Sequence, residues 1–187
     1  MHAIVVAGFL LLFSSSPSLV FADTLAGKKK AELCLLCHVA RQDRPFAPVL
    51  EGQPRDYFFA QIKAFQARLR TNAEMEQNAS SLEASDARDI ADFFAAQKPA
   101  RSPFLDAKSA GAGVVKLHEL HCGTCHLPTY SGQGEAARLA GQNPKYTAWT
   151  LRMIGLGKRR HPTEAAPEVK SLNDEDIDHI AHALASM

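Results

Sequence analysis

The segment Cys-Leu-Leu-Cys-His at residues 34–38 recurs as Cys-Gly-Thr-Cys-His at residues 122–126, and the two copies contain all four cysteines of the 187-residue chain. Cys-x-x-Cys-His is the attachment signature of c-type haem. Two thiols three positions apart on one helical turn can bond to the vinyl groups of one porphyrin, and the next histidine can coordinate its iron. The pattern therefore predicts two covalently attached haems. Their thioether anchors would be Cys34, Cys37, Cys122 and Cys125, and their first axial ligands would be His38 and His126.

Other uses of paired cysteines fit these segments less well. Two Cys-x-x-Cys pairs that share a zinc ion usually lie about 15–20 residues apart, whereas these pairs begin at positions 34 and 122. A disulfide framework or a redox-active dithiol gives no reason for a histidine directly after both pairs. Haem attachment alone explains every shared residue.

Residues 1–22 have the features of a secretory signal peptide. Residues 3–13 form an apolar run that is too short to span a membrane, and small residues near Ala22 suit signal peptidase. No Lys or Arg precedes this run, so an uncleaved N-terminal anchor is the alternative. We expect export to the periplasm, because c-type haem is attached outside the bacterial inner membrane. The mature chain would begin at Asp23 and contain no integral membrane segment.

Charge and periodicity limit the fold class and the partners. The formal net charge is +1 and neither half is strongly basic, which argues against nucleic acid as a partner. No stretch alternates with period two, so we predict an all-α fold. Two small domains are expected at 23–98 and 110–187, joined by a linker at 99–109. Each would wrap round one haem, which supplies the apolar centre that so short a domain lacks.

Helical periodicity and capping signals locate the expected elements. The first half is expected to contain helices at about 23–40, 54–69 and 85–97, and the second half helices that begin near 112, 144 and 174. Ser85 and Asn173 are the predicted N-caps of the last helix in each half. The polar segment 71–81, which contains Met75, is expected to be an irregular loop.

An internal repeat supports the division into halves. Gly52-Gln53 and Tyr57 match Gly141-Gln142 and Tyr146 without a gap, and the segment 82–90 matches 172–180 with the same internal spacing. Self-similarity at fixed spacing indicates a tandem duplication.

With these features the chain resembles the two-haem class I cytochromes c of the c4 type, and also the haem subunit of flavocytochrome c sulfide dehydrogenases. The resemblance covers nearly the whole mature chain: the haem motifs, the Gly-Gln and Tyr pairs, the late methionine and the closing helices. It implies two tandem class I cytochrome c domains that transfer single electrons. The redox partners would be a donor dehydrogenase and an acceptor cytochrome or oxidase, with the chain acting alone or as a subunit of an oxidoreductase.

The resemblance also implies a sixth iron ligand, because in that family a methionine from the loop before the last helix completes each iron. Met75 has this place in the first half. A thioether opposite His38 favours ferrous iron and raises the reduction potential.

The second half departs from this pattern. Ala165 aligns with Met75, and no methionine lies between Gly155 and Ser171. His161 lies four residues earlier in the same loop and is either the ligand or a solvated residue. Met153 is a weaker candidate, because it falls within a predicted helix.

The sixth ligand of the second iron separates two classes of function. An iron with two protein ligands is low-spin and suits electron transfer, which is the function we expect. An open position would instead suit an enzyme that handles a small molecule such as peroxide, a sulfur oxyanion or nitric oxide. No catalytic triad, phosphate-binding loop or supported carboxylate pair occurs in the sequence.

Overall fold

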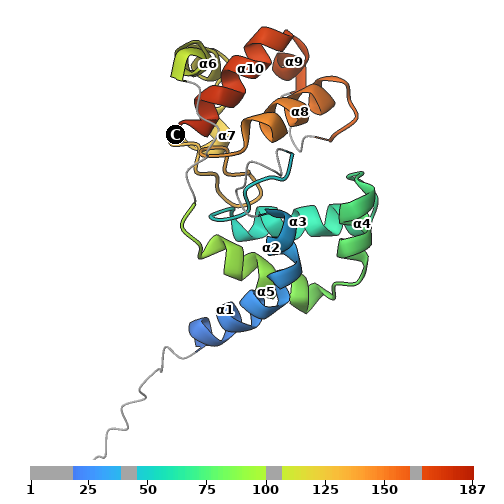
Figure 1. Cartoon of the computed structure of the whole chain (residues 1–187). Coiled ribbons are helices and arrows are strands. Elements are labelled where there is room, and N and C mark those ends of the chain that lie inside the picture. Colours follow the sequence, from blue (N-terminus) through green and yellow to red (C-terminus); the bar gives the residue numbers. More distant parts are fainter. Residues whose placement is uncertain (1–18, 39–45, 100–106, 161–165) are drawn as a thin grey trace, which may run out of the picture.

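The computed structural model describes residues 19–38, 46–99, 107–160 and 166–187, and these ranges contain helices and turns but no strand (Figure 1). The predicted all-α class is confirmed. The first half contains α1 (Leu19–Lys30), α2 (Glu32–His38), α3 (Arg55–Gln66), α4 (Ala73–Ser80) and α5 (Ala84–Ala95). The second half contains α6 (Ala107–Glu119), α7 (Gly123–His126), α8 (Pro144–Gly155), α9 (Ala166–Lys170) and α10 (Asp174–Ala185). None of these described helices is long and apolar enough to cross a membrane.

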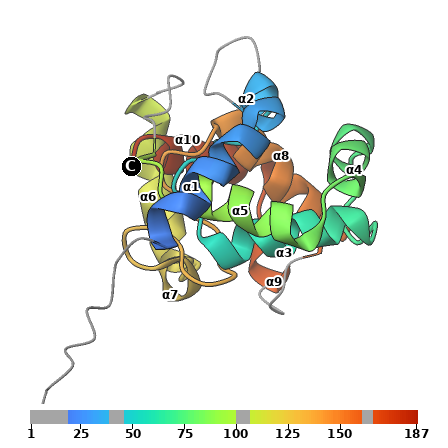
Figure 2. The same ribbon diagram turned by 90° about the horizontal axis from the view of Figure 1, so that it is seen from below.

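The two halves repeat one arrangement of helices (Figures 1 and 2). In the first half α1 packs against α5, and α3 contacts both α4 and α5. In the second half α6 packs against α10, and α8 contacts both α9 and α10. The duplication predicted from the sequence is therefore also a duplication of helix packing.

A glycine allows the main helix crossing in each half. A Cβ atom built on Gly27 of α1 would overlap the backbone carbonyl of Asp89 in α5, and one built on Gly113 of α6 would overlap the carbonyl of His179 in α10. Each crossing therefore brings two backbones closer than any side chain permits. This role of the two glycines was not predicted from the sequence.

Separate apolar clusters stabilise the two halves. The first cluster is centred on aromatic residues, and the rings of Phe58 and Phe94 stack with centroids 5.4 Å apart. The second is built on Leu117 of α6 together with Ile180 and Leu184 of α10. Burying each such side chain contributes about 1.5–3 kcal/mol.

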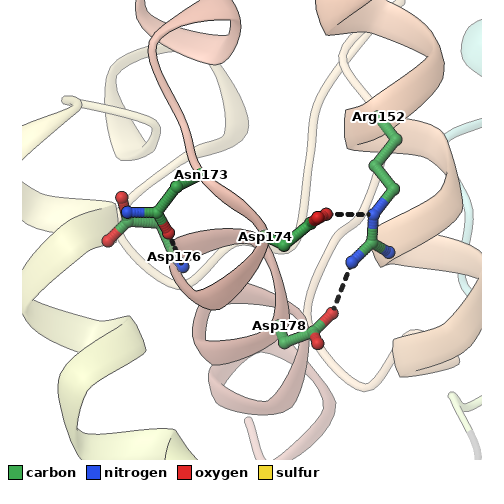
Figure 3. A network of polar contacts seen from close by, with 5 residues as sticks. All are labelled: Arg152, Asn173, Asp174, Asp176 and Asp178. Carbon is green, nitrogen blue, oxygen red and sulfur yellow. Dashed lines mark hydrogen bonds and ion pairs between the residues drawn. The ribbon is translucent and has the colours of Figure 1, made fainter.

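Polar contacts fix the start of α10 (Figure 3). Asn173 Oδ1 accepts the backbone N–H of Asp176 at 2.8 Å, which confirms the predicted N-cap. Arg152 of α8 binds the carboxylates of Asp174 at 2.7 Å and Asp178 at 3.1 Å. These contacts hold α10 against α8, although exposed ion pairs each add less than about 1 kcal/mol.

The prediction of an irregular loop at 71–81 is wrong, because α4 occupies most of this segment. Asn72 caps the helix, since its Oδ1 accepts the backbone N–H of Met75 at 2.9 Å. Ala79 is the one buried residue of α4, so the segment has no apolar stripe from which a helix could be predicted.

Several helix boundaries also differ from expectation. Helix α5 begins at Ala84, so the predicted N-cap Ser85 lies inside the helix and Glu83 precedes it. Helix α1 begins at Leu19, before the predicted mature terminus at Asp23. Helix α6 begins at Ala107, inside the range predicted as a linker.

Two glutamines join the halves through reciprocal contacts. The side-chain amide of Gln53 donates to the backbone carbonyl of Arg138 at 2.9 Å and accepts a hydrogen bond from the backbone N–H of Arg138 at 3.0 Å. The side-chain amide of Gln142 donates to the backbone carbonyl of Val49 at 3.0 Å and accepts a hydrogen bond from the backbone N–H of Val49 at 2.7 Å. We call the contact formed by these four residues the domain seam. Because the glutamines are equivalent in the repeat, the domain seam has the i-to-j and j-to-i pairing of a twofold-symmetric interface.

Candidate functional site: two haem-attachment segments

The first haem motif ends α2 with a histidine whose orientation is fixed. His38 is only 8% exposed, and its Nδ1 lies 3.0 Å from the carbonyl oxygen of Pro48. A carbonyl can only accept, so Nδ1 carries the proton and the lone pair is on Nε2, the arrangement found in metal-ligating histidines. Burial lowers the pKa of His38, which keeps the imidazole in the neutral form that binds metals.

The second motif repeats this geometry. His126 ends α7, and its Nδ1 lies 2.7 Å from the carbonyl oxygen of Ala137. By the same reasoning Nδ1 donates and Nε2 carries the lone pair. The same ring nitrogen is therefore engaged by a backbone carbonyl in both motifs.

The cysteines are compatible with thioether formation. None of the four forms a disulfide in the structure. Cys34 and Cys122, the first cysteine of each motif, are partly buried, and burial raises the pKa of both thiols.

Helix α4 places Met75 beside the first motif. The Sγ of Cys37 lies 3.8 Å from Oε1 of Glu74, the residue before Met75, and Met75 packs against the first apolar cluster. The Gln66 side chain holds the far end of α4, because its amide donates to the carbonyls of Ala79 at 2.9 Å and Leu82 at 2.8 Å. The segment predicted to supply the sixth ligand thus lies next to the predicted thioether anchors, and ligation by Met75 stays a prediction.

Helix α9 is the counterpart of α4 in the second half. It packs against α8, and the carboxylate of Glu168 is close enough to Cys122 to raise the pKa of that thiol, after the larger effect of burial. His161 and Ala165 lie outside the described residues. Met153 is partly buried within α8.

Two arginines next to the domain seam lack an acidic partner among the described residues. Arg70 donates to the hydroxyl of Tyr146 at 2.8 Å, across the seam. Arg159 donates to the hydroxyls of Tyr146 at 3.1 Å and, across the seam, Tyr57 at 3.4 Å. Burial alone would raise the pKa of Tyr146, but the charges of Arg159 and Arg70 outweigh it and lower this pKa to about 8.

This cluster of positive charge fits the cofactor predicted from the motifs. A haem carries two carboxylate groups, and guanidinium groups pair with carboxylates more strongly than with tyrosine hydroxyls. Arg70 and Arg159 were not identified from the sequence. Extending the repeat would have found them, because they have the same spacing as Gln53 and Gln142.

Known proteins are similar to this chain over most of its length. The chain is 31% identical over 166 residues to cytochrome c-552 of Acidithiobacillus ferridurans, covering 80% of this chain and 72% of that protein. It is 30% identical over 169 residues to cytochrome c4 of Pseudomonas aeruginosa, covering 85% of this chain and 84% of that protein. The chain belongs to the cytochrome c4 family. It is therefore a di-haem class I c-type cytochrome that transfers electrons, and its cofactors are two covalently attached c-type haems.

Solved structures agree with this assignment to the cytochrome c4 family. Cytochrome c4 of Pseudomonas stutzeri matches with a TM-score of 0.79 at 25% identity, covering 88% of this chain and 98% of that one. Cytochrome c4 of Acidithiobacillus ferrooxidans matches with a TM-score of 0.74 at 28% identity, covering 84% and 99%. The prediction of two tandem class I cytochrome c domains is confirmed.

A third relative is named for its redox partner. The thiosulfate dehydrogenase electron acceptor of Thiomonas intermedia is 30% identical over 171 residues, covering 84% of this cytochrome and 77% of that protein. No family model matches the chain.

Proposed function

We propose that this cytochrome is exported to the periplasm, where it takes single electrons from a dehydrogenase and delivers them to another cytochrome or an oxidase. The domain seam is the observation that carries the proposal. Its reciprocal amide–backbone pairs hold the two motif-bearing halves in one arrangement, which would keep two bound haems at a fixed separation for electron exchange. The relative named as an electron acceptor of a dehydrogenase supports a dehydrogenase as donor.

The proposed iron ligands follow from the motifs and the structure. His38 and His126 would bind the irons through Nε2, while their Nδ1–H groups on Pro48 and Ala137 orient the rings and increase the basicity of the ligand. The four motif cysteines would anchor the haems as thioethers, and the haems supply the one-electron chemistry. Arg70 and Arg159 would hold haem carboxylates at the domain seam.

We further propose a direction for electron flow. Met75 beside the first motif is a ligand that raises the reduction potential, and Ala165 takes its place in the second half. The second haem would therefore have the lower potential. Electrons would enter through the half that contains Cys122 and leave through the half that contains Cys34.

Export would depend on residues 1–22 acting as a cleaved signal peptide. Cleavage after Ala22 would remove the first turn of α1 and leave the part that carries Gly27 and packs against α5. Intact-mass measurement of the protein purified from the periplasm would test this, and a mass that retains residues 1–22 would contradict it.

A redox titration of the holoprotein, followed by optical and EPR spectroscopy, tests electron transfer against the enzymatic alternative. We expect two one-electron steps of different potential and two low-spin ferric haems. Two equal reduction potentials would contradict the proposed direction of electron flow. A high-spin second haem that binds cyanide or CO would favour an enzyme that handles a small molecule.

A further inference from the structure

Two charged residues on opposite sides of the domain seam have buried atoms that form no hydrogen bond in the described part of the structure. Arg138 is 4% exposed, and its Nη1 donates to the carbonyl of Ala140. Its Nε and Nη2 are buried without a hydrogen-bond partner, and so is Oε2 of Glu51 from the other half. Buried charges are costly unless they are compensated, and the opposite charges of Glu51 and Arg138 attract one another across the seam without forming a direct ion pair among the described contacts.

Each member of this pair is attached to a segment that orients a motif histidine. Arg138 directly follows Ala137, whose carbonyl accepts a hydrogen bond from His126. The Gln53 side-chain amide bonds both the carbonyl and the N–H of Arg138. Glu51 lies three residues after Pro48, whose carbonyl accepts from His38.

The electrostatic effect of Glu51 reaches Arg138 in the other half. Burial lowers the pKa of Arg138, and the charge of Glu51 opposes that effect. The two opposite charges therefore lie within electrostatic range of one another.

The pair breaks the symmetry of the duplicated chain. The repeat aligns Arg138 with Val49 and Glu51 with Ala140, so the equivalent positions on the other side of the domain seam carry no charge. Val49 and Arg138 make the same backbone contacts with a glutamine. The charges are thus not needed for the backbone contacts of the seam.

We infer that Glu51 and Arg138 tune the two haems in opposite directions, lowering the reduction potential of the first haem and raising that of the second. A nearby negative charge stabilises ferric iron, which carries one more positive charge than ferrous iron, and a nearby positive charge does the opposite. This inference rests on the proposed function, in which the Met75-containing half has the higher potential. The pair then narrows the gap between the haems and makes electron exchange between them more nearly reversible.

The test is a redox titration of the holoprotein with the substitutions Glu51→Gln and Arg138→Gln, which remove charge while keeping a polar side chain. We expect Glu51→Gln to raise the first potential by about 30 mV, a threefold shift in the reduction equilibrium at 59 mV per tenfold. Arg138→Gln should lower the second potential by a similar amount. The exposed residues Glu175 and Lys28 provide controls of matching charge, and Glu175→Gln and Lys28→Gln should leave both potentials unchanged.

The outcomes separate this inference from the proposed function. A pyridine haemochrome assay that finds fewer than two haems in the unsubstituted protein would refute the proposed function itself. With two haems present, unchanged potentials in both variants, or shifts of the opposite sign, would overturn the inference that Glu51 and Arg138 tune the haems. A shift with Arg138→Gln but none with Glu51→Gln would show that the guanidinium acts without its proposed partner. If Arg138→Gln fails to fold, the near-isosteric Glu51→Gln decides the question.

Discussion

Replacing Gln142 with alanine should weaken the contact between the two halves more than any surface substitution. The amide of Gln142 satisfies both the N–H and the carbonyl of Val49, a residue only 3% exposed, and Gln142 itself is 4% exposed. Alanine would leave both backbone groups buried and unpaired. Each such group costs about 1–3 kcal/mol, so the expected loss of unfolding free energy is about 2–6 kcal/mol.

The assay is unfolding of the holoprotein in guanidinium chloride, followed by far-UV circular dichroism. Gln77→Ala is the matched control, because Gln77 lies exposed on α4 and makes no side-chain hydrogen bond among the described residues. Gln53→Ala should cost about as much as Gln142→Ala, since Gln53 makes the equivalent pair with Arg138. If Gln142→Ala and Gln77→Ala unfold at the same denaturant concentration, the domain seam does not hold the halves together.

Three further substitutions test the iron ligands and the helix crossings. Met75→Ala should abolish the weak ferric absorbance near ~695 nm and lower the first potential, whereas an unchanged spectrum would show that Met75 is not a ligand. His161→Ala should convert the second haem from low to high spin in the EPR spectrum, and a retained low-spin signal would exclude His161. Gly113→Ala should destabilise the protein by about 1–3 kcal/mol in thermal unfolding, because its Cβ would overlap the carbonyl of His179. Gly111→Ala in the same helix is its control and should stabilise by about 0.5–1 kcal/mol, since Gly111 faces open space; equal effects would refute the close crossing.

The fold was predictable where the signal is local. The Asn173 cap and the helix that begins after Pro54 depend on residues adjacent in sequence, and the structure contains both. Helix α4 was missed because a tertiary contact, the Gln66 amide on two carbonyls near its end, stabilises it without an apolar stripe. The close crossing at Gly27 was missed for the same reason, since its partner carbonyl lies on another helix.

The candidate site also has features that were predicted from the sequence and features that were not. The motif histidines were identified from the sequence, but the carbonyls of Pro48 and Ala137 that orient them were not. Every residue has a backbone carbonyl, so the residue type does not show which carbonyl accepts the hydrogen bond. The glutamines Gln53 and Gln142 were recognised as repeated residues and not as the contact between the halves. A repeated polar residue gives its position in each half, whereas its partner depends on how the halves meet.

Equivalent positions of the two halves fall into two groups, those that carry the same residue and those that differ. Where both halves keep the same residue, it serves a need that both halves share. The repeated motif residues attach one haem in each half, and Gln53 and Gln142 form the domain seam, which uses the same contact twice. An electron carrier with two identical haems would have no preferred direction, because neither iron would hold the electron more tightly. A preferred direction would therefore depend on positions where the halves differ, and Glu51 and Arg138 are two such positions on the segments that orient the motif histidines. In the proposed arrangement the charges of Glu51 and Arg138 would oppose the difference expected from Met75, and the gap between the two potentials would be the balance of a large ligand effect and a smaller electrostatic one.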